Sequence, residues 1–436
     1  MCEEIVSGLA SFVGDSPTAF HAVANIGDIL QKNGYQRLYE EERWEISPGG
    51  KYYVTRNDSS IIALNAGAGL EDYCFKIAAS HSDSPTFKLK ENAEIQVKEK
   101  YMKLNTEGYG GMLCASWFDR PLSAAGRAMV KDGGAYRARL LNIDRDLLLI
   151  PNMAIHMNRK ANDGYTYNLQ VDMLPLFGGS GCKKGDFKKL VAKELDVEED
   201  CIYGMDLYLY NRMKPSVWGA KKEYISSPRL DDLQCAYTSL QGFLKGSDDG
   251  AVNVFACFDN EEVGSGTKQG AASTFLYDTL YRTNLCLGKG EEEFFRAASK
   301  GFMLSCDNAQ AVHPNHPDKT DADNCVFMNE GIVVKSHAGQ KYTSDAVSIA
   351  VFRGICEEAG VPLQFFANRS DMAGGSTLGN IAMSQVSMNS IDIGLAQLAM
   401  HSAYETAGVK DSYHMVQAVG QFFNSRIEML PIQSLT

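Results

Sequence analysis

The 436-residue sequence lacks features that define several large classes of protein. No apolar run approaches the length that a membrane-spanning helix requires, and the opening segment lacks the basic and apolar regions of a signal peptide. Basic residues are outnumbered by acidic ones, and the formal net charge of -12 argues against nucleic acid or an anionic membrane as a principal partner. We therefore expect a cytoplasmic protein with neither kind of partner.

Cysteine pairs with metal-binding spacing are also missing. The 11 cysteines are odd in number and irregularly spaced, and no C-x-x-C occurs, so neither a cysteine zinc site nor a disulfide framework is supported. Cys257 in "VNVFACF" lies in an apolar run and is interpreted as a small buried hydrophobe. Cysteines without a disulfide pattern indicate a reducing compartment. The G-x-S-x-G and H-E-x-x-H motifs are absent as well, which removes two common hydrolase classes.

The sequence does contain alternating strand and helix patterns, interrupted by a β-rich middle. Residues 3–34 predict two helices separated by "GDSPTAF", which combines a helix stop, a cap and a proline start. From about 92 to 225 the pattern changes to strands and glycine-rich turns. Alternating β and α units outside this range predict an α/β fold with a mostly parallel central sheet. We expect residues 1–91 and 226–436 to form one α/β domain, with 92–225 inserted as a β-rich domain.

Histidines and carboxylates follow the buried strands of the predicted α/β domain or open its helices. In chain order they are His81, Asp83, Asp231, Glu261, Glu262, Asp307 and His401. Ligands of open α/β sheets gather outside the carboxyl ends of the strands, so we expect these side chains to meet at one edge of the sheet. Two imidazoles and three carboxylates form a nitrogen and oxygen set suited to zinc, and a bridging carboxylate could hold two ions.

Each of these residues also has an ordinary structural explanation. His81 and Asp83 could belong to a strand that simply turns at "HSDSP". Asp231 could cap a helix, the glutamate pair could face water at a helix N-terminus, and Asp307 could end its strand in an Asx turn. His401 could be a packed or surface histidine. These separate explanations do not account for the coincidence of all the positions.

Five motifs occur in a fixed order along the chain: "HSDSP", "SPRLDDL", "DNEEVGS", "SCDNAQAVHPN" and "QLAMHSAYE". Together with "SPTAFHAV" and "YGGMLCASWFDRPLSAAGR", they make nearly the whole chain resemble the aspartyl aminopeptidase family, which includes vacuolar aminopeptidase I. The resemblance implies a zinc exopeptidase with two zinc ions per subunit, acting on peptides with a free N-terminus. It further implies an α/β catalytic domain, an inserted β-rich dimerisation domain and a homododecamer built from dimers. Cobalt or manganese could replace zinc in such a site.

The resemblance also assigns roles to the candidate residues. It gives the metal ligands as His81, Asp231, Glu262, Asp307 and His401, with Asp231 bridging the two ions. Asp83 matches the residue that orients His81, and Glu261 matches the general base. A carboxylate beside an activated water can take its proton and hand it to the leaving amine.

A further histidine, His156 in "AIHMNR", resembles one in the dimerisation domain that reaches a neighbouring subunit's active site. There it would help to stabilise the oxyanion of the reaction. Alternatively, His156 could only pack at the interface between subunits.

Two segments resemble the walls of the substrate pocket. In "MAGGSTLG" these residues are Gly375, Ser376 and Thr377, although the segment could be a plain glycine turn. In "VVKSHAGQKY" they are Lys335 and Tyr342. A partly desolvated Lys335 would pair with an acidic substrate side chain and would disfavour leucine, which predicts removal of N-terminal Asp or Glu. The alternative is a solvated lysine at the end of a strand, and with it an aminopeptidase of neutral preference.

Two other functions stay open at this point. A dinuclear zinc deacylase or amidase acting on small molecules would use the same metal chemistry. A non-catalytic assembly protein could keep the site for stability, but a structural metal site needs no spare carboxylate at the position of Glu261.

Overall fold

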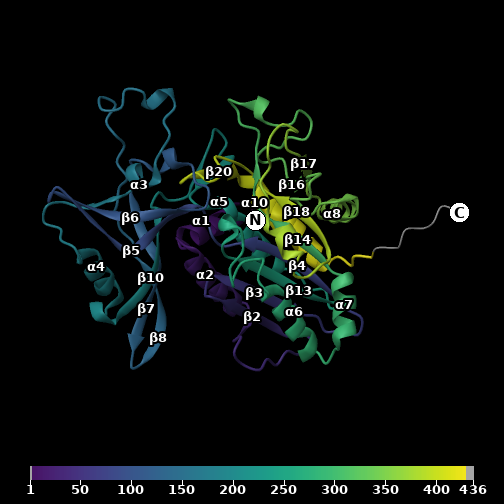
Figure 1. The fold of residues 1–436 in the computed structure, drawn as a ribbon. Coiled ribbons are helices and arrows are strands. Elements are labelled where there is room, and N and C mark those ends of the chain that lie inside the picture. Colours follow the sequence, from purple (N-terminus) through teal and green to yellow (C-terminus); the bar gives the residue numbers. More distant parts are fainter. Residues whose placement is uncertain (1, 429–436) are drawn as a thin grey trace.

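The computed structural model describes residues 2–428, whose strands form sheets of nine, six and five strands (Figure 1). In order across the nine-stranded sheet, the strands are β1 (Gln36–Leu38), β2 (Lys51–Arg56), β3 (Ser60–Ala66), β13 (Ala251–Phe258), β4 (Cys74–His81), β14 (Phe302–Cys306), β18 (Asn389–Gly394), β16 (Ile332–Lys335) and β17 (Leu363–Phe366). The four consecutive strands β13, β4, β14 and β18 are parallel. The predicted α/β class with a mostly parallel central sheet is confirmed.

The nine-stranded sheet is buried on both faces. In β13, Phe255 and Cys257 belong to the apolar core on one face, and Val254 and Ala256 belong to the core on the other. A strand covered on both sides can be apolar throughout, which is why "AVNVFACF" shows no polar alternation.

Helices cover each face of this sheet. One core receives side chains from α1 (Cys2–Gly14), α2 (Ala19–Lys32), α5 (Leu230–Phe243), α8 (Ala346–Ala359) and α10 (Val409–Asn424). The other receives them from α6 (Phe275–Cys286), α7 (Glu291–Ser299) and α9 (Leu378–Ala382). The two helices expected within residues 3–34, with their break at "GDSPTAF", are α1 and α2.

Helix α8 shows how local sequence fixes an element. The Asp345 carboxylate accepts from the Ser348 amide at 2.8 Å, and the Ser348 hydroxyl accepts from the Asp345 amide at 2.9 Å. This reciprocal pair satisfies two amides that the first turn of a helix leaves free. At the other end, Gly360 adopts φ 65°, a left-handed conformation that glycine reaches without strain.

The six-stranded sheet is antiparallel and has its own apolar core (Figure 1, left). Its strands are β5 (Thr86–Val97), β6 (Tyr101–Tyr109), β7 (Leu122–Asp132), β8 (Ala135–Asn142), β9 (Leu176–Gly178) and β10 (Ile202–Asn211), and its helices are α3 (Leu169–Asp172) and α4 (Asp186–Leu195). Arg127 donates to the backbone oxygen of Asn57 at 2.7 Å and so joins this sheet to the turn after β2. The domain boundaries at 92 and 225 stay a prediction, and β5 runs through the first of them.

A third, small sheet was not predicted from the sequence. Its strands are β11 (Ser216–Trp218), β12 (Tyr224–Ser227), β20 (Glu405–Gly408), β19 (Ala396–Leu398) and β15 (Ala309–Gln310). Because β12 leads into Asp231 and the turn between β19 and β20 carries His401, this sheet positions two of the candidate site residues.

Short 3-10 helices complete the fold at η1 (Cys114–Trp117), η2 (Ala161–Asp163), η3 (Glu199–Cys201), η4 (Glu261–Val263) and η5 (Pro317–Lys319). Within residues 2–428, no helix combines the length and the apolar character needed to cross a membrane.

Candidate metal centre

Histidine and carboxylate side chains gather at the carboxyl ends of β4, β13 and β14. His81 is the last residue of β4, and Phe258, the last residue of β13, lies opposite it in the sheet. Ligand atoms of His81, Asp231, Asp232 and Asp307 lie within 4.8 Å of one another, as do those of Asp231, Glu262 and His401. The structure thus brings the five predicted metal ligands together in two groups that share one residue.

Asp231 is the shared residue and faces both histidines. Its Oδ1 lies 3.4 Å from His81 Nε2, and its Oδ2 lies 3.4 Å from His401 Nε2. On the first side, His81 Nε2 is also 3.9 Å from Asp307 Oδ1. On the second side, His401 Nε2 is 3.4 Å from Glu262 Oε2. The two carboxylate oxygens of Asp231 therefore point toward two separate positions, each lined by one imidazole and one further carboxylate.

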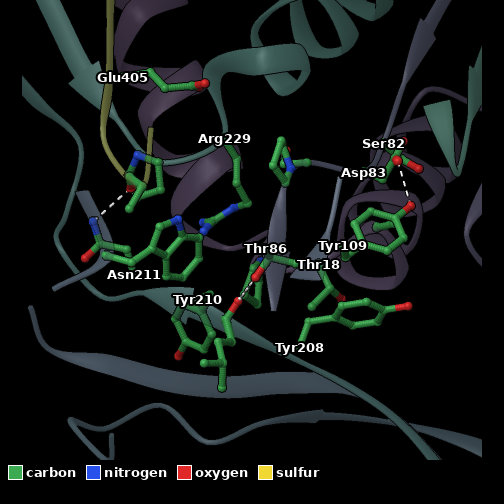
Figure 2. Close-up of a pocket in the computed structure, with 18 of the residues that line it drawn as sticks. Thr18, Ser82, Asp83, Thr86, Tyr109, Tyr208, Tyr210, Asn211, Arg229 and Glu405 are labelled. Atoms are coloured by element: carbon green, nitrogen blue, oxygen red, sulfur yellow. Dashed lines mark hydrogen bonds between the residues drawn. The ribbon is translucent and has the colours of Figure 1, made fainter. Parts of the chain in front are cut away.

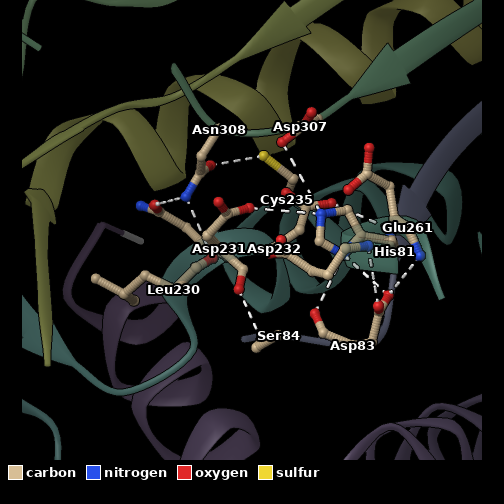
Figure 3. Close-up of polar contacts among 12 residues, drawn as sticks. His81, Asp83, Ser84, Leu230, Asp231, Asp232, Cys235, Glu261, Asp307 and Asn308 are labelled. Carbon is tan, nitrogen blue, oxygen red and sulfur yellow. Dashed lines mark hydrogen bonds and ion pairs between the residues drawn. The ribbon is translucent and has the colours of Figure 1, made fainter. Parts of the chain in front are cut away.

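Each histidine is oriented through its other ring nitrogen. His81 Nδ1 lies 3.1 Å from the Asp83 carbonyl and 3.3 Å from Asp83 Oδ1 (Figure 3). His401 Nδ1 lies 3.0 Å from the carbonyl oxygen of Gly111. A proton on each Nδ1 satisfies these acceptors and leaves Nε2 as a lone-pair donor toward the centre, which is the usual arrangement of metal-binding histidines.

Asp83 also holds the turn that carries the glutamate pair. Its Oδ1 accepts from the Glu261 amide at 3.1 Å, and its Oδ2 accepts from the Glu262 amide at 3.2 Å. Tyr109 donates its hydroxyl to the same Oδ2 at 2.7 Å. Asp83 therefore links the orientation of His81 to the positions of Glu261 and Glu262.

Burial and mutual repulsion dominate the electrostatics of the acids. Burial raises the pKa of Glu261 to about 8, with His81 opposing this shift and Asp307 adding to it. Burial and the nearby Asp231 charge raise the pKa of Glu262 well above its usual range. Asp231 behaves differently: burial opposes its charge, but the nearby His401 and His81 outweigh burial and lower its pKa. The cluster thus gathers several acids, whose charge His81, His401 and the Lys335 ammonium beside Asp307 offset in part.

Unpartnered oxygens show what the cluster can hold. Asp231 Oδ1, Asp232 Oδ1 and Glu262 Oε1 are buried without a hydrogen-bond partner among the described residues. Such atoms are costly to bury unless a cation or donor meets them. Imidazole nitrogens and carboxylate oxygens in sets of three or four match the ligand preference of zinc. The residues present therefore fit zinc ions.

Two further acids at the site were missed by sequence reasoning. Asp232 is fully buried and accepts from the His81 amide at 3.0 Å. Glu405 is 1% exposed, and its two oxygens accept from the Asp231 amide at 3.0 Å and the His401 amide at 2.7 Å. The double aspartate of "SPRLDDL" could have suggested Asp232, and Glu405 is the last residue of the motif "QLAMHSAYE", in which only His401 was given a role.

Lys335 ends strand β16 close to Asp307. It is 2% exposed, so the alternative of a solvated lysine is wrong. Its Nζ donates to the carbonyl oxygens of Asp307 at 2.8 Å and Asn308 at 3.3 Å, and lies 3.4 Å from Asp307 Oδ2. The ring of Tyr342 is 5.4 Å from the same atom. Burial opposes the charge of Lys335, but Asp307 and neighbouring acids raise its pKa, so it stays protonated.

The other predicted pocket loop lies before α9. Gly375 and Ser376 are exposed there, whereas Thr377 is buried and donates its hydroxyl to Asp392. The contact of this loop with a substrate stays a prediction.

His156 lies apart from the cluster in an exposed turn at residues 155–157. Among the described residues, no hydrogen bond or ion pair joins it to the metal centre. Its predicted role at a neighbouring subunit's site stays a prediction.

Comparisons with known proteins agree with this site. A family model described as "Aminopeptidase I zinc metalloprotease (M18)" matches residues 12–423. The "Probable M18 family aminopeptidase 2" of Clostridium novyi (strain NT) is 46% identical over 422 residues, covering 95% of this chain and 98% of the relative.

Solved structures are similar over nearly the whole chain. A chain of the "Cryo-EM structure of the Ape4 and Nbr1 complex" has a TM-score of 0.93 and 34% identity, covering 97% of this chain and 86% of that chain. The "Structure of S. cerevesiae mApe1 dodecamer" has a TM-score of 0.85 and 25% identity, covering 97% of this chain and 96% of that chain.

Proposed function

Since the chain belongs to the aminopeptidase I zinc metalloprotease family, M18, it is a zinc metallopeptidase of the aminopeptidase class, and we propose that it works with two zinc ions per subunit. The ligands would be His81, Asp231, Glu262, Asp307 and His401. The observation that carries this proposal is the position of Asp231, whose two oxygens each lie 3.4 Å from a different histidine Nε2. The first ion would lie between His81 and Asp307, and the second between Glu262 and His401.

Glu261 is the proposed general base. When bound, zinc supplies Lewis-acid chemistry, polarising the scissile carbonyl and favouring deprotonation of water. A carboxylate oxygen of Glu261 lies within 4.8 Å of ligand atoms of His81 and Glu262, and Asp83 fixes the Glu261 amide at 3.1 Å. Its carboxylate would accept the proton of the attacking water and pass it to the leaving amine. His81 and Asp307 would hold the other side of the reacting centre in place.

Hydrolysis of substrates with free and blocked N-termini tests the proposed reaction. An aminopeptidase that recognises the α-amine should cleave a free dipeptide and leave its N-acetylated counterpart intact. A deacylase or amidase would reverse that order. Rapid cleavage of the blocked substrate would therefore contradict the proposed exopeptidase activity.

We further propose that the preferred N-terminal residue is acidic. Lys335 supplies a buried cation at the edge of the cluster, with the Tyr342 ring 5.4 Å and Asp307 Oδ2 3.4 Å from its Nζ. A substrate carboxylate would meet this cation, whereas a leucine side chain would leave it less well compensated. Gly375, Ser376 and Thr377 would form another wall of the pocket.

Replacing Lys335 tests the acidic preference. In wild type, kcat/KM for aspartyl reporters should exceed that for leucyl reporters by roughly ten to a hundred fold, and Lys335→Leu should reverse the order. Zinc content is measured in parallel, because Lys335 also contacts Asp307. A wild type that prefers leucyl reporters would establish neutral preference and leave the aminopeptidase reaction intact.

We also propose that the chain assembles as a homododecamer of dimers, because the similar mApe1 of S. cerevesiae is itself a dodecamer. His156 would then reach a neighbouring subunit from its exposed turn. Light scattering should give a particle about twelve times the mass of the 47.8 kDa chain. A monomer at micromolar concentration would contradict both the assembly and the proposed role of His156.

The cytoplasm is the proposed location. All 11 cysteines are free, including the buried Cys235, Cys257, Cys306 and Cys356. Free thiols in this number support a reducing compartment.

A further inference from the structure

One short segment of the six-stranded sheet reaches the metal centre. Strand β6 ends at Tyr109, whose hydroxyl donates to Asp83 Oδ2 at 2.7 Å (Figure 2). Two residues later, the carbonyl oxygen of Gly111 lies 3.0 Å from His401 Nδ1. The segment 109–111 therefore contacts residues that serve both halves of the centre, although it belongs to a different sheet from the ligands.

We propose that residues 109–111 are a positioning element that prepares both metal positions for binding. This inference rests on the proposed function, because it requires His81 and His401 to be metal ligands. Tyr109 acts through Asp83, and Gly111 acts directly on His401. The six-stranded sheet thereby helps to build the active site, in addition to the role in subunit contacts that is proposed for its domain.

The hydrogen-bonding partners of the Tyr109 hydroxyl fix which bond it accepts and which it donates. It accepts a hydrogen bond from Asn260 Nδ2 at 2.8 Å, so its own proton is free to go to Asp83. Within residues 2–428, Asp83 Oδ2 has one other donor, the Glu262 amide at 3.2 Å. Loss of the hydroxyl would leave this oxygen weakly held and let the carboxylate rotate away from His81.

His401 is held at two points, by Gly111 of the segment and by Leu113 just after it. Gly111 accepts from its ring, and the Leu113 amide donates to its carbonyl oxygen at 2.9 Å. With Glu405 accepting from the His401 amide at 2.7 Å, both main-chain groups and one ring nitrogen are fixed. The remaining atom, Nε2, is thereby aimed at Asp231 and Glu262.

Gly110 allows the segment to come this close. Its φ is 74°, and a Cβ there would lie 3.1 Å from Glu262 Cβ and 3.4 Å from Pro85 Cα. Glycine accepts this backbone conformation at little cost, whereas alanine would be strained and would press on Glu262. The residue is thus suited to a close approach between the segment and a metal ligand.

Tyr109→Phe tests the inference, with Tyr208→Phe as the matched control. The Tyr208 ring lies 5.6 Å from that of Tyr109, and the two rings line one cavity (Figure 2), but among the described residues no hydrogen bond ties the Tyr208 hydroxyl to the cluster. Zinc affinity is measured by competition with a chromophoric chelator, and ligand geometry by the visible spectrum of the cobalt-loaded protein. Tyr109→Phe should weaken metal binding by about 10- to 100-fold, alter the cobalt spectrum and lower kcat more than it changes KM. Tyr208→Phe should match wild type in all of these.

Unfolding of the chelator-treated proteins separates positioning from simple stability. Equal unfolding temperatures for metal-free wild type and Tyr109→Phe, together with weaker zinc binding in the variant, support the inference. A lower unfolding temperature with unchanged zinc affinity and cobalt spectrum would overturn it. Gly110→Ala, which removes no hydrogen-bonding group, should also weaken zinc binding, and unchanged affinity in both variants would overturn the inference too. Failure of wild type to bind zinc at all would instead contradict the proposed function.

Discussion

At the scale of single residues, the two histidines share one arrangement. Nδ1 of His81 faces Asp83, Nδ1 of His401 faces the carbonyl of Gly111, and both Nε2 atoms face Asp231. Each ring is thus held by the protein at one nitrogen and free to bind at the other. The two neighbouring glutamates have different surroundings. The His401 imidazole faces the Glu262 carboxylate, which suits Glu262 as a ligand, and Glu261 is the proposed base.

The change Glu261→Gln should separate binding from turnover. The variant is expected to retain its zinc and to lose about 10² to 10⁴ in kcat, because a neutral amide cannot accept the proton of the attacking water. Zinc content is measured together with the turnover of an aminoacyl reporter. Glu292→Gln, at an exposed position in α7, is the control and should leave both quantities unchanged. Full zinc content with near-normal kcat in Glu261→Gln would remove Glu261 from its role as base.

His21 gives the protein a pH-dependent stability outside the metal centre. Burial and the charge of Arg229 lower its pKa from 6.5 to about 4, so it is neutral in the folded protein at pH 5. The unfolded chain binds a proton there, and stability therefore falls as pH decreases through 6.5 toward 4.

Replacing His21 should reduce this pH dependence. From pH 7 to pH 5, zinc-loaded wild type should lose about 1–2 kcal/mol more than His21→Asn in its free energy of unfolding. Urea unfolding at the two pH values measures the difference. Parallel losses in the two proteins would show that His21 is not the group responsible.

At the scale of elements, the strand ends were predictable and the small sheet was not. Strands β4 and β14 are mostly apolar, and His81 ends the first while Asp307 follows the second; in a parallel sheet such ends meet at one edge. Strands such as β15, with 2 residues, carry too little pattern to be recognised. Glu405 and Gly111 escaped prediction for a related reason, because folding alone brings Glu405 to the distant Asp231 and Gly111 to the distant His401.

Two helical glycines, Gly242 and Gly354, differ in the space around them and so test how closely the helices pack. A Cβ at Gly242 in α5 would lie 2.6 Å from Val419 Cβ in α10, whereas a Cβ at Gly354 in α8 would meet nothing within 4 Å. Gly242→Ala should therefore destabilise the protein by about 1–3 kcal/mol through overpacking. Gly354→Ala should be neutral or stabilise it by up to about 1 kcal/mol, because alanine is the better helix former. Denaturant unfolding of both variants checks this, and equal effects would contradict the close approach of α5 and α10.

At the scale of the whole molecule, the metal centre lies where the three sheets meet. The nine-stranded sheet contributes His81, the six-stranded sheet contributes Tyr109, and the small sheet contributes Glu405. The sequence pattern predicted the nine-stranded sheet and the candidate ligands at its edge. The family resemblance predicted an inserted β-rich domain but not the contacts that the other two sheets make with the centre. Glu405 accepts from the Asp231 amide, the His81 amide donates to Asp232, and Tyr109 donates to Asp83, so correct assembly of the centre requires all three sheets.

The zinc content of the purified chain tests the dinuclear centre most directly. Protein saturated with zinc, freed of excess metal and analysed by mass spectrometry should contain two zinc ions per chain. Asp231→Ala should lose most of both ions, because its two oxygens face the two positions. Glu292→Ala, at an exposed site, should keep them. One zinc per wild-type chain, or two retained in Asp231→Ala, would contradict a centre bridged by Asp231.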